Sequence, residues 1–315
     1  MSENAPIMKK IVDNMSRVIV GKEGPAKLMV LSLAASGHVL IEDVPGIGKT
    51  TMAYAMARSV GLTFNRIQFT PDILPSDITG FTLFNQKTGE FEYRQGNIMS
   101  HVILADEINR TSPKTQASML EVMEEKQVTV DGKSYKVPEP FIVIATQNPI
   151  EYMGTYPLPE AQMDRFLMKI TMGYPTRAEE INVLYRFQTN HPMKSVEKVV
   201  TGEEIAELQE KVRQVKVEES LAGYIVDIIS ATRRHEHILL GCSPRAALGL
   251  FRAAQAEALY NERDYVLPED IRDLAVHVLS HRITLRQEAK IKKISNESII
   301  QDIAQRQKVP VLSKR

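Results

Sequence analysis

The stretch Asp43-Val44-Pro45-Gly46-Ile47-Gly48-Lys49-Thr50-Thr51 decides the fold, because it has the pattern of a phosphate-binding loop. The apolar run 39–41 before it is typical of a buried strand, and residues 52–57 after it are typical of a helix. Strand, glycine-containing loop and helix form the context that this motif requires. The flanking segments therefore disfavour the alternative, a chance Gly-Lys-Thr in a turn that starts a helix.

This loop predicts how a nucleotide is held. Gly46 and Gly48 let backbone N–H groups turn towards phosphate oxygens, and the new helix presents its positive end to the same anion. Lys49 can reach the β- and γ-phosphates, and the Thr50 hydroxyl can hold Mg²⁺. We therefore expect ATP and Mg²⁺ as cofactors. The predicted contacts of the loop are Pro45, Gly46, Ile47, Gly48, Lys49, Thr50 and Thr51.

The first position of the loop departs from the usual pattern. Such loops begin with glycine, and this one begins with Asp43. An aspartate side chain can accept backbone hydrogen bonds within a turn. We therefore interpret Asp43 as a tolerated variant.

Alternating apolar runs and helical patterns predict the fold class. Five apolar runs are expected to be buried strands, at residues 38–42, 64–69, 102–105, 141–146 and 166–170. Helical patterns between them, such as the one that starts at Ser112-Pro113, favour an α/β sandwich with a parallel sheet. Hairpins are expected at Val128–Tyr135, around Asp131-Gly132, and at Phe81–Tyr93.

The character of the chain changes after Pro175. No confident strand is expected from about Thr176 onward, and helices are expected at 203–215, 219–234, 244–261 and 268–280. We predict two domains, a nucleotide-binding core at residues 1–190 that carries both hairpins and a small all-helical lid at residues 191–315.

Two predicted strands end in polar residues suited to phosphate chemistry. The apolar run 102–105 is followed by Asp106-Glu107, a Walker B pattern in which Asp106 holds Mg²⁺ and Glu107 polarises the attacking water. The run 141–146 leads to Asn148, which is placed to contact the γ-phosphate or the water. A plain turn residue before a proline is the alternative for Asn148.

Two arginines are further candidates. Arg165 precedes the fifth predicted strand, where an ordinary surface charge is the alternative. Arg245 lies in the first turn of a predicted helix. A cation is unfavourable at that helix end, which suggests that Arg245 meets an anion there.

Taken together, these motifs resemble those of the MoxR-type AAA+ ATPases. The resemblance spans about Val18 to His281 and rests on Glu42–Thr50, Leu104–Arg110, Ala145–Pro149, Pro159–Phe166 and Ser243–Ala246. It implies an αβα core with a helical lid, and assembly into a hexameric ring. It also implies that Asn148 is sensor 1, that Arg165 is the arginine finger on a neighbour's ATP, that Arg245 is sensor 2, and that Val20-Gly21 contact adenine. Such proteins are chaperone-like remodellers, often paired with von Willebrand factor A-domain proteins.

Composition limits the other possibilities. Lysine plus arginine equals aspartate plus glutamate at 39 each, which offers no global electrostatic case for a nucleic acid partner. Cys242 is the single cysteine, no signal-peptide pattern follows Met1, and no run reaches the length of a membrane span. A cytoplasmic protein is therefore expected.

Three functions remain open at this stage. The first is a chaperone-like ATPase that couples ATP hydrolysis to remodelling, maturation or cofactor or metal insertion of partner proteins. The second is a nucleotide-gated binding module with little turnover. The third is a nucleic-acid motor, which the neutral composition disfavours. Glu107 speaks against the second function, because a pure switch needs no acid that polarises water. A further open point concerns Phe81, Phe84, Phe91 and Tyr93, which either grip a substrate chain or pack the hairpin onto the core.

Overall fold

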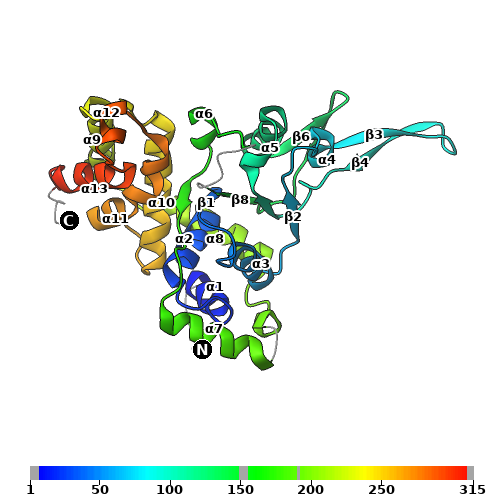
Figure 1. The fold of residues 1–315 in the computed structure, drawn as a ribbon, viewed down its shortest axis with the longest axis horizontal. Helices are drawn as coiled ribbons and strands as arrows, with labels where there is room; N and C mark the ends of the chain where they lie inside the picture. The colour runs from blue at the N-terminus through cyan, green and yellow to red at the C-terminus, as the bar shows by residue number, and fades with distance from the viewer. Residues whose placement is uncertain (1–6, 149–154, 190–191, 311–315) are drawn as a thin grey trace.

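A five-stranded parallel sheet forms the centre of the amino-terminal part, and a group of helices follows it in the chain (Figure 1). The computed structural model describes residues 7–148, 155–189 and 192–310. The strands lie in the order β2-β5-β8-β1-β9, and each neighbouring pair is parallel. They comprise β1 (Val39–Glu42), β2 (Phe64–Gln68), β5 (Val102–Asp106), β8 (Ile142–Gln147) and β9 (Met168–Ile170). The predicted parallel sheet followed by helices is therefore confirmed.

Alternating side chains of the central strands fill two separate apolar cores, one on each face of the sheet. In β1, Val39 and Ile41 belong to one core and Leu40 belongs to the other. In β5, Leu104 belongs to the same core as Val39 and Ile41, and Ile103 belongs to the same core as Leu40. Successive side chains of a strand point to opposite faces, so strands covered on both faces must be apolar throughout. This explains why the strands were visible in the sequence as unbroken apolar runs.

Helices cover both faces of the sheet. One core joins the sheet to α1 (Ile7–Ser16), α2 (Glu23–Ala34), α3 (Lys49–Ser59) and the later helices. The other joins it to α4 (Pro75–Thr79) and α5 (Pro113–Glu125). Helix α5 begins as predicted, because the Ser112 hydroxyl accepts a hydrogen bond from the Thr115 amide at 3.4 Å. The sandwich places the carboxyl ends of all five strands at one edge.

Both predicted hairpins are present. Strands β3 (Gly80–Asn85) and β4 (Glu90–Gln95) form the longer one, which extends away from the body of the molecule (Figure 1). Strands β6 (Gln127–Val130) and β7 (Lys133–Lys136) form the shorter one. Asp131 and Gly132 have φ angles of +49° and +75°, as a two-residue turn of type I′ requires.

The carboxyl-terminal part is helical, as expected, with one correction. Strands β10 (Ile238–Leu240) and β11 (Thr284–Leu285) form a small antiparallel pair in a region where no strand was expected. Runs of two and three residues are too short to show an alternating pattern, so only the tertiary structure reveals them. The helices of this part are α8 (Gly202–Gln214), α9 (Glu219–Arg234), α10 (Pro244–Tyr260), α11 (Pro268–Leu279), α12 (Gln287–Ile291) and α13 (Asn296–Arg306).

The helical part lies beside edge strand β9. Helix α11 contacts β9, and helices α8 and α10 contact α2. The remaining elements are α6 (Glu160–Met163), α7 (Arg177–Thr189) and the short 3₁₀ turns Ile108–Arg110, Pro192–Ser195 and Ser280–Arg282. The predicted domain boundary at residues 190 and 191 falls outside the described residues, so the division into residues 1–190 and 191–315 stays a prediction.

Candidate functional site

The loop between β1 and α3 has an open, glycine-dependent backbone. Gly46 and Gly48 have φ angles of +83° and +93°. A Cβ atom at either position would meet no atom within 4 Å, so these glycines are needed for backbone conformation and not for space. Helix α3 starts at Lys49 without a side-chain cap. Its first N–H groups are therefore available to an anion.

Lys49 faces the acids at the ends of the strands. Its Nζ atom donates a hydrogen bond to the Asp43 carbonyl oxygen at 2.6 Å. Burial lowers the pKa of Lys49, and the charges of Asp106, Asp43 and Glu107 oppose this shift. The structure thus brings the loop lysine and the Asp106-Glu107 pair to the same edge of the sheet, as the strand order requires.

Asp43 fastens the loop to the end of β9. One carboxylate oxygen accepts the Val44 amide at 2.8 Å, which is the expected bond within the turn. The other oxygen accepts the amides of Met172 at 2.7 Å and Gly173 at 2.6 Å, which sequence reasoning missed. Asp43 is buried, so these three donors depend on its carboxylate. Asp43 thus ties the loop to a neighbouring strand.

We expect the substitution Asp43→Ala to lower the free energy of unfolding by about 1–3 kcal/mol, because it leaves buried amides without an acceptor. Asp43→Asn keeps one carbonyl oxygen and should lose less. Urea denaturation of both variants measures the effect, with Asp227→Ala, which removes an exposed carboxyl on α9, as the control. An unchanged unfolding midpoint for Asp43→Ala contradicts this role.

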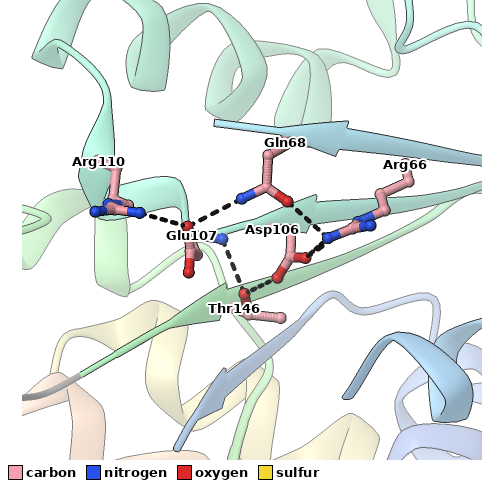
Figure 2. Close-up of polar contacts among 6 residues, drawn as sticks. All are labelled: Arg66, Gln68, Asp106, Glu107, Arg110 and Thr146. Atoms are coloured by element: carbon pink, nitrogen blue, oxygen red, sulfur yellow. Dashed lines mark hydrogen bonds and ion pairs between the residues drawn. The ribbon is translucent and has the colours of Figure 1, made fainter. Parts of the chain in front are cut away.

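The two acids at the end of β5 sit in a shared hydrogen-bond network (Figure 2). One oxygen of Asp106 accepts the Thr146 hydroxyl at 2.6 Å, and the other accepts Arg66 Nη2 at 2.6 Å. The amide of Glu107 donates to the same Thr146 hydroxyl at 2.9 Å. Glu107 has a φ angle of +58°, an uncommon conformation for a residue with a side chain, and the Thr146 bond helps to hold it.

The Glu107 carboxylate has two partners of its own. Gln68 Nε2 donates to Oε2 at 2.9 Å, and Arg110 Nη1 lies 3.1 Å from the same oxygen. Arg110 stands in the turn after the strand, and this bond lies within its own subunit. Gln68 and Arg66 were missed. The sequence did carry a signal for them, because both point to one face at the end of strand 64–69.

The remaining nucleotide candidates lie around this edge. Asn148 follows β8 directly and is buried. Pro149, the next residue of its motif, lies outside the described residues. Gly21 has a φ angle of +69°. Next to it, Lys22 donates to the Tyr174 carbonyl oxygen at 3.1 Å, one residue beyond the amides that bind Asp43. Lys22 therefore ties the segment Val20-Gly21 to the stretch after β9 that also binds Asp43 of the loop.

The structure does not bring Arg165 and Arg245 to the phosphate loop. Arg165 precedes β9, and the nearby Leu167 amide donates a hydrogen bond at 2.8 Å to the carbonyl oxygen of His38, the residue before β1. Both arginines lie at this amino-terminal edge of the sheet and share one acid. This acid is Glu124, at the end of α5. Arg165 Nε lies 3.3 Å from its Oε2 atom, and Arg245 Nη2 lies 3.1 Å from its Oε1 atom.

A basic cavity of about 250 Å³ surrounds this pair. Besides the two arginines, it is lined by Lys126, Arg252 and Arg282, against the acids Glu124 and Asp164. Cations therefore outnumber carboxylates in its wall. A site of this composition favours an anion.

The aromatic side chains of the longer hairpin were expected either to grip a substrate chain or to pack the hairpin onto the core. The structure shows both arrangements, packed and exposed. Tyr93 stacks on Tyr135 of the shorter hairpin with 4.0 Å between ring centroids, and both rings pack against the apolar core. Phe81, Phe84 and Phe91 are 46%, 49% and 71% exposed, so their rings are free to contact another molecule. Phe84 and Phe91 lie side by side across the strands, with ring centroids 5.2 Å apart.

The residues at the carboxyl edge fit a Mg²⁺ ion held by few protein ligands. Asp106 and Thr50 supply hard oxygen atoms, and Mg²⁺ in nucleotide sites takes its other ligands from water and phosphate. Among residues 7–148, 155–189 and 192–310 there is no cluster of three or more histidine, cysteine, aspartate or glutamate side chains that suits a metal ion.

Comparisons with known proteins support the same class. The family described as ATPase family associated with various cellular activities (AAA) matches residues 38–168, and the AAA lid domain matches residues 230–303. YeaC of Bacillus subtilis is 53% identical over 97% of this chain and 96% of its own length. Chaperone MoxR1 of Mycobacterium tuberculosis is 40% identical over 96% of this chain and 82% of its own length.

A second relative and a solved structure agree. Protein MoxR of Methylorubrum extorquens is 30% identical over 86% of this chain and 85% of its own length. A solved protein structure from Cytophaga hutchinsonii has a TM-score of 0.90 and 41% identity, covering 97% of this chain and 95% of that one.

Fold and site together define an AAA-type ATPase with a helical lid. The chain belongs to the MoxR family of these ATPases, as its motifs led us to expect. Membership implies that it binds and hydrolyses ATP, and AAA proteins typically form oligomers. None of the described helices is long and apolar enough to cross a membrane.

Proposed function

We propose that this protein is a Mg²⁺-dependent ATPase whose nucleotide sites are completed by a neighbouring subunit in a hexameric ring, and that it remodels partner proteins. The observation that carries the proposal is the separation of Lys49 from Arg165 and Arg245. Lys49 lies beyond the carboxyl end of β1, and the two arginines lie at its amino end. The four residues of this strand span about 13 Å. The arginines are therefore poorly placed for the ATP of their own subunit.

At the carboxyl edge, this chain's residues hold and orient the reactants. The loop amides and Lys49 bind the phosphates, while Thr50 and Asp106 hold the Mg²⁺ ion. When bound, this ion neutralises charge on the phosphate oxygens. Glu107 orients and polarises the attacking water, and Asn148 contacts the γ-phosphate or that water.

At the amino edge, Arg165 acts on the ATP of the adjacent subunit and offsets charge in the transition state. Arg245 stands beside it, so we propose that it serves the same neighbouring nucleotide and not its own. Glu124 pairs with both arginines in the single subunit. An incoming phosphate replaces this carboxylate as the partner of both.

The proposed action on proteins rests on relatives and on the hairpin. One relative is named Chaperone MoxR1. The exposed rings of Phe81, Phe84 and Phe91 offer an apolar contact for a client, and a von Willebrand factor A-domain protein is the proposed partner. The balance of 39 basic and 39 acidic residues gives no support for a nucleic acid partner. Multiple-turnover ATPase measurements separate this function from a nucleotide-gated module, in which hydrolysis is incidental.

We expect Lys49→Ala to weaken ATP binding at least tenfold, because a hydrogen bond to a charged group contributes about 1.5–3 kcal/mol. The fold should remain, since Lys49 bonds only the Asp43 carbonyl in the hydrogen bonds described. Isothermal titration with ATP measures the loss. Lys87→Ala, in the exposed hairpin turn, is the control. Unchanged affinity in Lys49→Ala contradicts the assignment of the loop.

A capture experiment tests the remodelling function. Glu107→Gln subunits should hold ATP and client together, so proteins recovered with them in the presence of ATP are candidate clients. Lys49→Ala subunits, which bind ATP poorly, provide the matched background. Recovery of the same proteins with both variants contradicts an ATP-dependent action on clients.

A further inference from the structure

The residues on either side of Arg165 are held by the helical part of the chain. Asp164 Oδ1 accepts Arg282 Nη1 at 2.7 Å, and Asp164 Oδ2 accepts the Ser243 hydroxyl at 2.8 Å. The Phe166 carbonyl oxygen accepts Arg282 Nη2 at 2.7 Å. One guanidinium therefore bridges the residue before Arg165 and the residue after it.

The same contacts reach Arg245. Ser243 is the N-cap of α10, and its hydroxyl also accepts the Ala246 amide at 3.3 Å. Because Arg245 lies in that first turn, the Asp164 carboxylate sets the start of α10 relative to the segment that carries Arg165. Glu124 then joins the two arginine side chains themselves.

The Arg282 side chain is buried and packs closely against α10. Its side chain is 3% exposed, and a Cβ atom on Gly249 of α10 would lie 3.3 Å from its Nη2 atom. Burial lowers the pKa of Arg282, and Asp164 opposes that shift. Its Nε atom has no hydrogen-bond partner within the described part of the chain. A buried ion pair that leaves one donor unpaired is poorly explained by stability alone, which suggests a positioning role.

We propose that Arg282, through Asp164 and the Phe166 carbonyl, is the positioning residue that holds Arg165 in reach of a neighbouring subunit's phosphate. The proposal rests on the proposed sharing of the nucleotide site. It assigns a function to a residue of the helical part that bonds the segment before β9, away from Lys49 and its loop. A shift of the lid then moves Arg165 together with Arg245, because one network of side chains carries both.

Subunit mixing tests this role against a general loss of structure. Arg282→Met subunits should bind ATP with the parent affinity and hydrolyse it at least tenfold more slowly. Mixed with Lys49→Ala subunits, which keep an intact Arg165, they should regain activity. Mixed with Arg165→Ala subunits they should regain none, because neither partner presents a positioned arginine.

The outcomes separate the alternatives. Restored activity with Arg165→Ala subunits overturns the proposal, and so does a loss of ATP affinity that parallels the loss of rate. Failure with both partners also overturns it, since that is the signature of a purely structural role. Arg272→Met, a substitution on the surface of α11, should leave activity at the parent level. If Arg165→Ala and Lys49→Ala subunits themselves do not complement, the shared site fails, and the proposed function fails with it.

Two further variants keep the test decisive if Arg282→Met does not fold. The double variant Asp164→Asn with Arg282→Met removes both charges, so no unpaired charge stays buried. In the mixing experiment this double variant should behave like Arg165→Ala. It should regain activity with Lys49→Ala subunits and regain none with Arg165→Ala subunits. Ser243→Ala removes one bond to Asp164 together with the N-cap bond of α10, leaves Arg282 in place, and should show a smaller loss of rate in the same pattern. A double variant that folds and complements Arg165→Ala overturns the assignment.

Discussion

Replacing Arg165 with alanine should lower the ATPase rate by about 10³–10⁵-fold, the contribution of an arginine finger in phosphoryl transfer. ATP binding should survive, because Lys49 and the loop amides lie at the opposite edge of the sheet. The fold should survive as well, since Arg165 makes a partly exposed ion pair with Glu124, and pairs of this kind contribute about 0–1 kcal/mol. Steady-state rates and titration with ATP measure the two effects separately.

Mixing subunits reveals in which subunit Arg165 acts. In a mixed ring, a Lys49→Ala subunit can lend its intact Arg165 to the ATP held by an Arg165→Ala neighbour, so hydrolysis should return. Arg177→Ala, which removes an exposed arginine at the start of α7, is the control and should keep the parent rate. If mixing under subunit exchange restores nothing, or if a monomer is fully active with ATP, the shared site is wrong.

Replacing Glu107 with glutamine should slow hydrolysis by about 10²–10⁴-fold, the usual contribution of a positioned general base. Glutamine keeps the shape of the side chain and one oxygen that can accept from Gln68. It loses the basic oxygen that polarises water. Binding of Mg-ATP should therefore stay near the parent value, and single-turnover rates with bound ATP report the chemical step directly.

The control for Glu107 is Glu121→Gln, which changes an exposed acid on α5. It should leave both binding and rate unchanged. A parent-like rate in Glu107→Gln contradicts the assignment of the water-polarising role to Glu107.

Local patterns predicted most of the sheet and the carboxyl-edge site. The phosphate loop, the Asp106-Glu107 pair and the Asp-Gly hairpin each depend on neighbouring residues, so a short window of sequence contains the physical cause. Strand periodicity also places Gln68 on the same face as Arg66, but only the pairing of β2 with β5 brings it beside Glu107. The pair β10–β11 was not predicted, since its strands are too short for any periodic signal.

By itself the sequence determined the class of protein, because loop conformation, strand burial and helix capping are set by residues within a few positions of one another. The tertiary structure alone decided that Arg165 and Arg245 share Glu124 at the edge away from Lys49. It also joined Arg282 to Asp164 across 118 positions. Contacts at such separations depend on how the lid packs beside β9, and packing is a property of the whole chain that no local pattern encodes.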